Sequence, residues 1–144
     1  MSETTKKSLD WFRNTKYITR TTMISPAEGA KIYLGLEPVD MRKAMDGLAI
    51  LVAETLKQDP QSGHIFIFHN RNRNKIKCLV WDKNGFVLYY KRLEKRSFKI
   101  PRKMTNGCIL LDKHELNWLL AGLDFLAIKQ HSEFQLQKYI NKIN

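Results

Sequence analysis

Three apolar stretches separated by short polar segments constrain the fold of this chain more than any other feature of its sequence. They cover residues 64–69, 76–82 and 86–92, and each is rich in β-branched or aromatic side chains. Asn84-Gly85 lies between the second and third stretches, and this dipeptide favours a type I′ turn because both residues tolerate positive φ angles. We therefore predict an antiparallel meander of three consecutive strands.

A two-residue turn at Asn84-Gly85 also predicts which residues face each other across the hairpin. The expected pairs are Lys83 with Phe86, Trp81 with Leu88, and Lys77 with Arg92. The stretch 64–69 has apolar side chains on both faces, which is typical of a strand in the centre of a sheet.

Apolar residues recur at helical spacing in two segments outside the meander. Over 40–57 they are three or four residues apart, and Asp40 is expected to cap the first turn. Over 112–122, Asp112 and Glu115 have the spacing of a capping box. Three shorter elements complete the prediction: strands near 31–34 and 108–111, and a last helix over 132–143.

The fold class that follows is α+β, with an antiparallel β-meander of three to five strands and two or three helices packed on one face. A chain of 144 residues fits a single domain and is long enough to bury a core without disulfides. We expect a poorly ordered N-terminal extension over 1–22, one α+β domain over 23–126, and a helical C-terminal tail over 127–144.

The net charge of +11 is concentrated in one part of the chain. Residues 61–105 contain twelve basic and two acidic residues, a net charge of +10, whereas 23–60 has a net charge of −2 and 106–144 has none. A localised excess of this kind produces a directed field that attracts polyanions. The segment 61–105 is therefore the predicted nucleic-acid contact surface.

Arginine, lysine and asparagine alternate in the loop 70–75, and further cations follow the last strand of the meander. Arginine binds phosphate with two parallel hydrogen bonds, and asparagine bonds either phosphate or base edges. An alternative is a solvated sheet edge that lysines protect from aggregation. The predicted nucleic-acid-binding residues are Arg71, Arg73, Lys75, Lys77, Lys91, Arg92, Lys95, Arg96, Arg102 and Lys103.

Aromatic residues are interleaved with these cations in the hairpin. If exposed, they would stack on unpaired bases, and if buried, they would belong to the core of the sheet. Trp81 and Leu88 are expected to form a core pair. Tyr89 and Tyr90 point to opposite faces of one strand, so we expect at least one of them to be exposed.

Carboxylates raise the alternative of a metal-dependent nuclease, which needs several of them to converge. Each candidate has a structural explanation instead, because Asp40 suits a cap, Asp46 suits a helix ion pair with Arg42, and Asp59 and Asp82 suit turns. His64 and His69 lie on opposite faces of one strand and do not share a metal ion. We therefore expect no catalytic residues, no metal and no cofactor.

The cysteines and the hydropathy of the chain indicate its cellular compartment. Cys78 and Cys108 lie in no CxxC pair, so two free thiols in a reducing cytoplasm are expected. No stretch has the roughly 18 consecutive apolar residues of a membrane span, and the first 22 residues lack the apolar core of a signal peptide. We expect a cytoplasmic protein without membrane contact.

Six short motifs occur in order between residues 24 and 126. They are Pro38-Val-Asp-Met-Arg-Lys43, Asp46-Gly-Leu48, Asp59-Pro-x-Ser-Gly-His64, Trp81-Asp-x-x-Gly-Phe86, Tyr90-Lys-Arg-Leu-Glu94 and Leu119-Leu-x-Gly-Leu-Asp124. Together they closely resemble the TnpB-type accessory proteins of the insertion-sequence sixty-six family of bacterial transposable elements. The loop that commonly holds Gly and Asp in that family contains Asn72-Arg73-Asn74 here, which makes this chain more basic at that point.

The resemblance implies a protein that is encoded beside a larger transposase and assists transposition, with no established catalytic residues. We therefore expect a non-enzymatic accessory protein that binds DNA, in particular transposon ends, through the basic hairpin region. An alternative is an adaptor that docks on the transposase or on another element-encoded protein without contacting DNA. A metal-dependent nuclease is the third possibility.

Residues 1–22 lie outside both the apolar pattern and the resemblance, so we predict that they are dispensable for folding. A chain that starts at Met23 is expected to unfold in one cooperative thermal transition, with the same midpoint as the full chain, when followed by circular dichroism. A broad transition without a pre-transition baseline in the shortened chain would contradict this prediction.

Overall fold

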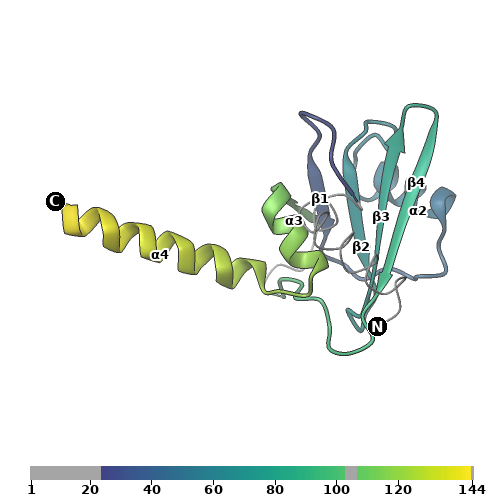
Figure 1. Ribbon diagram of the computed structural model, residues 1–144. Coiled ribbons are helices and arrows are strands. Elements are labelled where there is room, and N and C mark those ends of the chain that lie inside the picture. Colours follow the sequence, from purple (N-terminus) through teal and green to yellow (C-terminus); the bar gives the residue numbers. More distant parts are fainter. Residues whose placement is uncertain (1–23, 103–106, 144) are drawn as a thin grey trace, which may run out of the picture.

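The protein is described here by a computed structural model that covers residues 24–102 and 107–143 (Figure 1). In these residues a sheet of five strands has the order β4-β3-β2-β1-β5. The strands are β1 (Ile32–Gly35), β2 (Ile65–His69), β3 (Lys75–Asp82), β4 (Gly85–Arg92) and β5 (Cys108–Leu111). The predicted α+β class is confirmed, and so is the meander β2-β3-β4.

The direction of one strand differs from the prediction, because the sheet is mixed and not wholly antiparallel. β1 pairs with β2 in parallel, with Ile32 opposite Ile65, whereas β1 and β5 are antiparallel. The connection between β1 and β2 contains the helix α2 (Met45–Glu54), which returns the chain to the end of the sheet where β1 began. A helical crossover of this kind joins parallel neighbours, whereas a short hairpin would have made them antiparallel.

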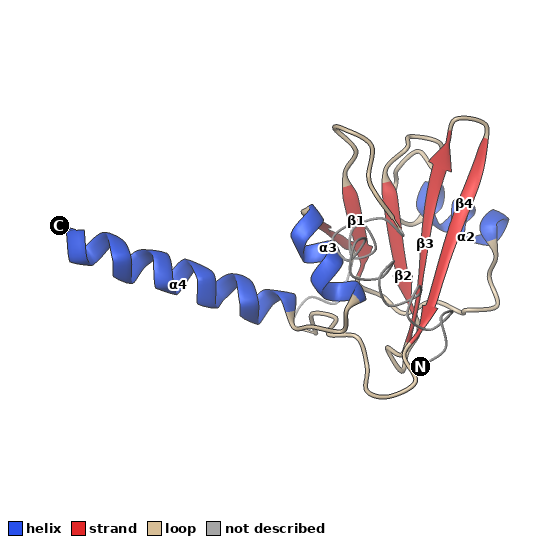
Figure 2. Cartoon of the chain, viewed as in Figure 1, coloured by secondary structure: helices blue, strands red, loops and turns tan. Residues whose placement is uncertain are grey.

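The helices cover both faces of the sheet, which corrects the prediction that they share one face (Figure 2). Strand alternation explains the result, because neighbouring residues of β1 and β2 point to opposite faces and both sets are apolar. On the α2 face, Tyr33 and Phe66 pack with Leu48. On the opposite face, Leu34 and Ile67 pack with the helix α3 (Lys113–Leu120) and with Phe98 and Phe125; we call this the α3 face.

The predicted hairpin register is wrong by one residue at the turn. Asp82 pairs with Gly85, so the two loop residues are Lys83 and Asn84, and Lys83 has the positive φ of 56°. This register places Trp81 opposite Phe86, where their rings meet edge to face with centroids 5.0 Å apart. The change moves each partner by two residues, so every side chain keeps the face that the sequence predicted.

The two main helices begin differently. The α3 capping box is present as predicted: the Asp112 carboxylate accepts from the Glu115 N–H at 2.8 Å, and the Glu115 carboxylate accepts from the Asp112 N–H at 3.1 Å. Helix α2 is not capped by Asp40, because it begins at Met45, after Ala44. Asp40 accepts hydrogen bonds from Arg42 in the preceding turn instead.

The last helix, α4 (Phe125–Ile143), begins earlier than the predicted 132–143 and extends away from the sheet (Figure 1). Phe125 is fully buried and anchors its first turn to the α3 face. Leu126, Leu136 and Ile140 are exposed. In the parts of the chain that the structure describes, no helix combines the length and the apolar character that crossing a bilayer requires. The predicted extension over 1–22 lies outside the described residues.

The capping box of α3 generates a stability prediction. Replacing Asp112 with Ala removes the acceptor for the Glu115 N–H and keeps the backbone N–H that the Glu115 carboxylate binds, so the free energy of unfolding is expected to fall by about 1 kcal/mol. Urea unfolding measures the change. Lys113→Ala, at an exposed position of the same turn, is the control and is expected to change stability by less than about 0.5 kcal/mol.

Candidate nucleic-acid interface

The loop that joins β2 to β3 is organised by Asn70. Its side-chain oxygen accepts from the N–H groups of Asn74 and Lys75, each at 3.0 Å, and its amide nitrogen donates to the Asn74 side chain at 2.6 Å. The side-chain polar groups of Asn70 and Asn74 thus form hydrogen bonds within the loop and not with a ligand. Arg71 and Asn72 are exposed at its tip.

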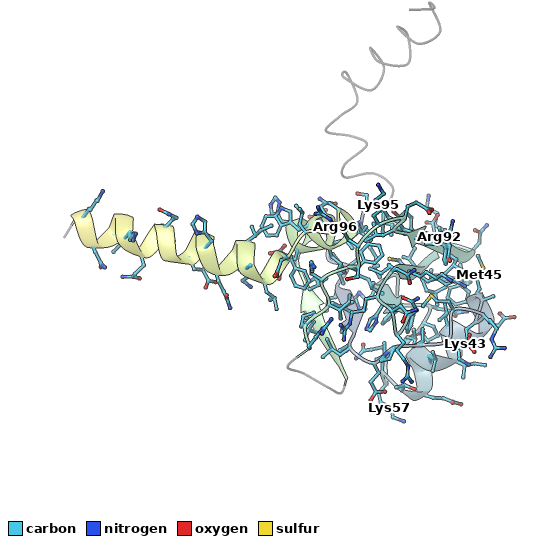
Figure 3. The ribbon with its side chains drawn as sticks, turned by 90° about the horizontal axis from the view of Figure 1, so that it is seen from below. Lys43, Met45, Lys57, Arg92, Lys95 and Arg96 are labelled. Atoms are coloured by element: carbon cyan, nitrogen blue, oxygen red, sulfur yellow. The ribbon has the colours of Figure 1, made fainter. Side chains whose placement is uncertain are left out.

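The segment that follows β4 lies against this loop. The Leu93 N–H donates to the Asn74 carbonyl at 2.8 Å, and the Phe98 N–H donates to the Arg73 carbonyl at 2.6 Å. Phe98 is 1% exposed and anchors the segment in the core. Residues 94–97 therefore arch out beside the 70–74 loop, with Lys95 and Arg96 exposed on the arch (Figure 3).

These contacts bring together two basic segments that are about twenty positions apart in the sequence. The pair Lys75–Arg92 joins them at the last rung of the β3–β4 ladder. We call residues 70–75 and 92–96 the basic end of the sheet. Both segments belong to the 61–105 block that the sequence predicted as the contact surface.

The ten predicted residues differ in how free they are to meet a ligand. Lys103 lies outside the described residues, and Lys75 is partly buried at the start of β3. Arg92 is exposed and pairs with Glu94 at 3.0 Å, a surface ion pair that costs little to exchange for another anion. Four cations are exposed with no hydrogen-bond or ion-pair partner in the described part of the chain: Arg71, Lys95, Arg96 and Arg102.

The ammonium groups of Lys77 and Lys91 bind backbone carbonyls at opposite faces of the sheet. The Lys77 ammonium donates to the carbonyls of Met41 and Lys43, at 2.7 and 2.8 Å, and so fixes the turn before α2. The Lys91 ammonium donates to the Leu120 carbonyl at 2.7 Å, at the C-terminus of α3, where a cation also complements the helix dipole. Both ammonium groups are therefore occupied within the fold.

Arg73 is the most unusual cation of the set. It lies in the left-handed region with a φ of 57°, and its Nε atom is buried with no partner in the described residues. Its charge acts on His69, a buried side chain whose ring nitrogens lie 3.0 Å from the Asn70 carbonyl and 3.2 Å from the Leu36 carbonyl. Burial lowers the pKa of His69, and the Arg73 charge lowers it further.

The turn before α2 adds cations that are not among the ten predicted residues. The Val39 N–H donates to the His69 carbonyl at 2.8 Å, so this turn lies at the same end of the sheet as the 70–74 loop. Arg42 pairs with Asp40 at 2.6 Å, and not with Asp46, and this pairing lowers the pKa of Asp40 to about 2. Lys43 is exposed. The contacts of Lys77 with the carbonyls of Met41 and Lys43 place this turn in the same region as well.

No group of three or more His, Cys, Asp or Glu side chains suited to a metal ion occurs within residues 24–102 and 107–143. The His64 ring accepts a hydrogen bond from the Lys31 N–H at 2.9 Å, and both ring nitrogens of His69 face backbone carbonyls. The Cys78 thiol is buried, which raises its pKa. Both histidines have structural partners in the fold, and the described carboxylates do not converge.

The fold and this surface define a small α+β protein with a mixed sheet and one strongly basic end. The sequence profile described as "IS66 Orf2 like protein" matches residues 30–130. The chain therefore belongs to the IS66 Orf2-like family of insertion-sequence proteins, as its motifs predicted, and this membership is consistent with an accessory role in transposition.

Two relatives from Sinorhizobium fredii (strain NBRC 101917 / NGR234) are similar along most of their length. The uncharacterized protein y4jC is 36% identical over 108 residues, which cover 75% of this chain and 92% of y4jC. The uncharacterized protein y4hO is 30% identical over 103 residues, which cover 72% of this chain and 89% of y4hO. No solved structure matches the chain significantly.

The buried His69 generates a pH prediction. The unfolded chain takes up a proton on this histidine near its ordinary pKa of about 6.5, whereas the folded protein resists protonation because its pKa is lowered. The stability contributed by neutral His69 is therefore present above about pH 6.5 and declines as the pH falls towards the folded pKa, by at most about 1.4 kcal/mol per pH unit. Urea unfolding across this range measures the slope.

His69→Gln is expected to flatten this dependence, even if it lowers stability at every pH. His131→Gln, at an exposed position of α4, is the control and is expected to leave the slope unchanged. An undiminished slope in His69→Gln would show that another group dominates the acid sensitivity.

Proposed function

We propose that this protein is a non-enzymatic accessory factor of transposition that binds DNA through the basic end of the sheet. The observation that carries the proposal is the pair of backbone hydrogen bonds that join the 70–74 loop to residues 93–98. They place the loop that carries Arg71 beside the segment that carries Lys95 and Arg96, and all three side chains are exposed. Family membership supplies the setting in transposition.

The distribution of acidic groups supports the same proposal. The segment 61–105 contains two acidic residues, Asp82 and Glu94. Asp82 ends β3 beside the hairpin turn, at the end of the sheet remote from the 70–74 loop. Glu94 is therefore the one carboxylate of this segment at the basic end, and in the neighbouring turn Asp40 is neutralised by Arg42. The field at this end thus favours a polyanion.

A lysine-protected sheet edge explains the arrangement less well than a binding surface does. Edge protection needs charges along the exposed strand β4, but Val87, in the middle of that strand, is 48% exposed. The free cations gather beyond the end of the strand, in two segments joined to each other. Phosphates would meet several of them at once there.

The adaptor alternative has its own supporting observation in α4. This helix leaves the sheet after Phe125 and presents exposed Leu126, Leu136 and Ile140 to its surroundings. Exposed apolar side chains are typical of protein contact surfaces. An adaptor that docks on the transposase or another element-encoded protein would use α4, whose exposed apolar residues are distinct from the cations of the basic end, so docking is compatible with DNA binding.

The proposal predicts that three exposed cations of the basic end contribute strongly to DNA affinity. Changing Arg71, Lys95 and Arg96 together to Ala is expected to weaken binding to duplex transposon-end DNA by about tenfold or more. Because about three phosphate contacts are lost, the log–log dependence of affinity on salt should become shallower by about 3. Electrophoretic shift assays across a salt series, with transposon-end and random DNA, measure both quantities.

A matched control has the same loss of charge at the other end of the sheet. Lys31, Lys83 and Lys113 are all exposed, and they lie before β1, in the hairpin turn and at the start of α3. Their combined change to Ala is expected to alter affinity by less than about threefold, as a net-charge effect alone. Equal losses in the two triple variants would contradict a site at the basic end, and absence of any DNA binding, with transposase added or omitted, would reject the proposal.

A further inference from the structure

Tyr90 is a half-exposed aromatic residue on the edge strand of the sheet. It lies on the α2 face of β4, is 49% exposed, and is not part of the apolar cluster that α2 covers. The other aromatic residues of the hairpin on this face, Trp81 and Phe86, contact each other and are partly buried. Tyr90 is therefore the aromatic ring of the hairpin that remains open to a ligand.

One face of the Tyr90 ring is held by Lys77. The two residues are directly opposite in the β3–β4 ladder, and the Lys77 ammonium lies 5.4 Å from the ring centroid. The same ammonium is fixed by the carbonyls of Met41 and Lys43, so the contact orients the ring. Because Lys77 comes from the strand on the inner side of β4, it occupies the inward face of the ring. β4 ends the sheet, so no strand lies on the outward side.

Cations surround this ring on the same face of the sheet. Lys75 and Arg92 pair two residues further along the ladder, and strand alternation places both on the side of Tyr90. Lys43, whose carbonyl binds Lys77, is exposed, and it lies on the same flank of the molecule as Arg92 (Figure 3). An open aromatic ring with several cations around it combines a stacking surface with phosphate contacts.

We propose that Tyr90 is a stacking platform for an unpaired base, so that the basic end binds single-stranded DNA in addition to duplex. This inference rests on the proposed DNA binding and deepens it. A continuous duplex presents base edges in its grooves and phosphates on its outside, whereas the flat ring of Tyr90 complements the face of a base. Only a base that is out of the double helix, or at the end of a strand, exposes that face.

The experiment separates stacking from charge with two probes of equal length and charge. An oligothymidylate of about 12 nucleotides is compared with an abasic oligonucleotide of the same length, which keeps the phosphates and lacks the bases. Fluorescence anisotropy with the full chain is expected to show about tenfold tighter binding of the oligothymidylate.

Variants then assign the difference to the ring. Tyr90→Leu is expected to bind the oligothymidylate about tenfold more weakly, with abasic and duplex binding changed by less than about threefold. Tyr90→Phe keeps the ring and is expected to retain the preference. Val87→Ala, on the opposite face of the same strand, is the control and is expected to behave as the unmodified protein.

Two results overturn the inference, and they differ from failure of the proposed function. Equal affinity of the unmodified protein for both single strands, or an unchanged preference in Tyr90→Leu, removes the stacking role while duplex binding stands. If salt-sensitive duplex binding persists in those experiments, the proposed function stands. Absence of binding to all three probes rejects both. The comparison of the two strands on the unmodified protein decides the question even if Tyr90→Leu is poorly folded.

Discussion

The pairing of β2 with both of its neighbours is the contact on which the rest of the structure depends. All five residues of β2 are buried, and they pair in parallel with β1 and antiparallel with β3. Because both faces of β2 are apolar, the sheet needs a cover on each side, and α2 and α3 provide it. The last residue of β2, His69, is also buried, and the basic loop begins directly after it. The site is therefore placed by the most deeply buried strand of the protein.

The cations of the predicted surface divide according to what their charged groups contact. Lys77 and Lys91 bind backbone carbonyls at opposite faces of the sheet and stabilise the turn before α2 and the end of α3. Arg71, Lys95 and Arg96 are exposed at the basic end. A lysine that fills orphan carbonyl groups satisfies a structural need, since unpaired backbone acceptors are costly when buried. Lysine thus stabilises the fold at Lys77 and Lys91 and faces solvent at Lys95.

Tyr90 connects these two roles. Its inner face meets Lys77, which is a structural cation, and its outer face is open beside Lys75 and Arg92. A cation that is already bound to two carbonyls orients the ring at little entropic cost, so the platform is preorganised. The proposed stacking surface therefore arises from the same contact that fixes the turn before α2.

Much of the secondary structure could be predicted from local patterns. The meander, the α3 capping box and the face of each hairpin residue follow from periodicities of two and from capping chemistry, which depend on neighbours in sequence. The start of α2 was missed because Asp40 had a nearer competitor, the Arg42 side chain, which binds it at 2.6 Å. The hairpin turn was placed one residue late because Lys83 accepts a positive φ, which allows Trp81 to meet Phe86.

The sequence by itself determined the α+β class, the strands of the meander and the location of the excess charge between residues 61 and 105, since each depends on residue types along the chain. Only the tertiary structure decided that β1 is parallel to β2, that the helices cover opposite faces, and which cations are free. These features depend on contacts between residues far apart in sequence, such as Lys77 with Met41 and Lys91 with Leu120. Local patterns carry no signal for such contacts, because a lysine has the same spacing and charge whether its ammonium group meets a carbonyl or water.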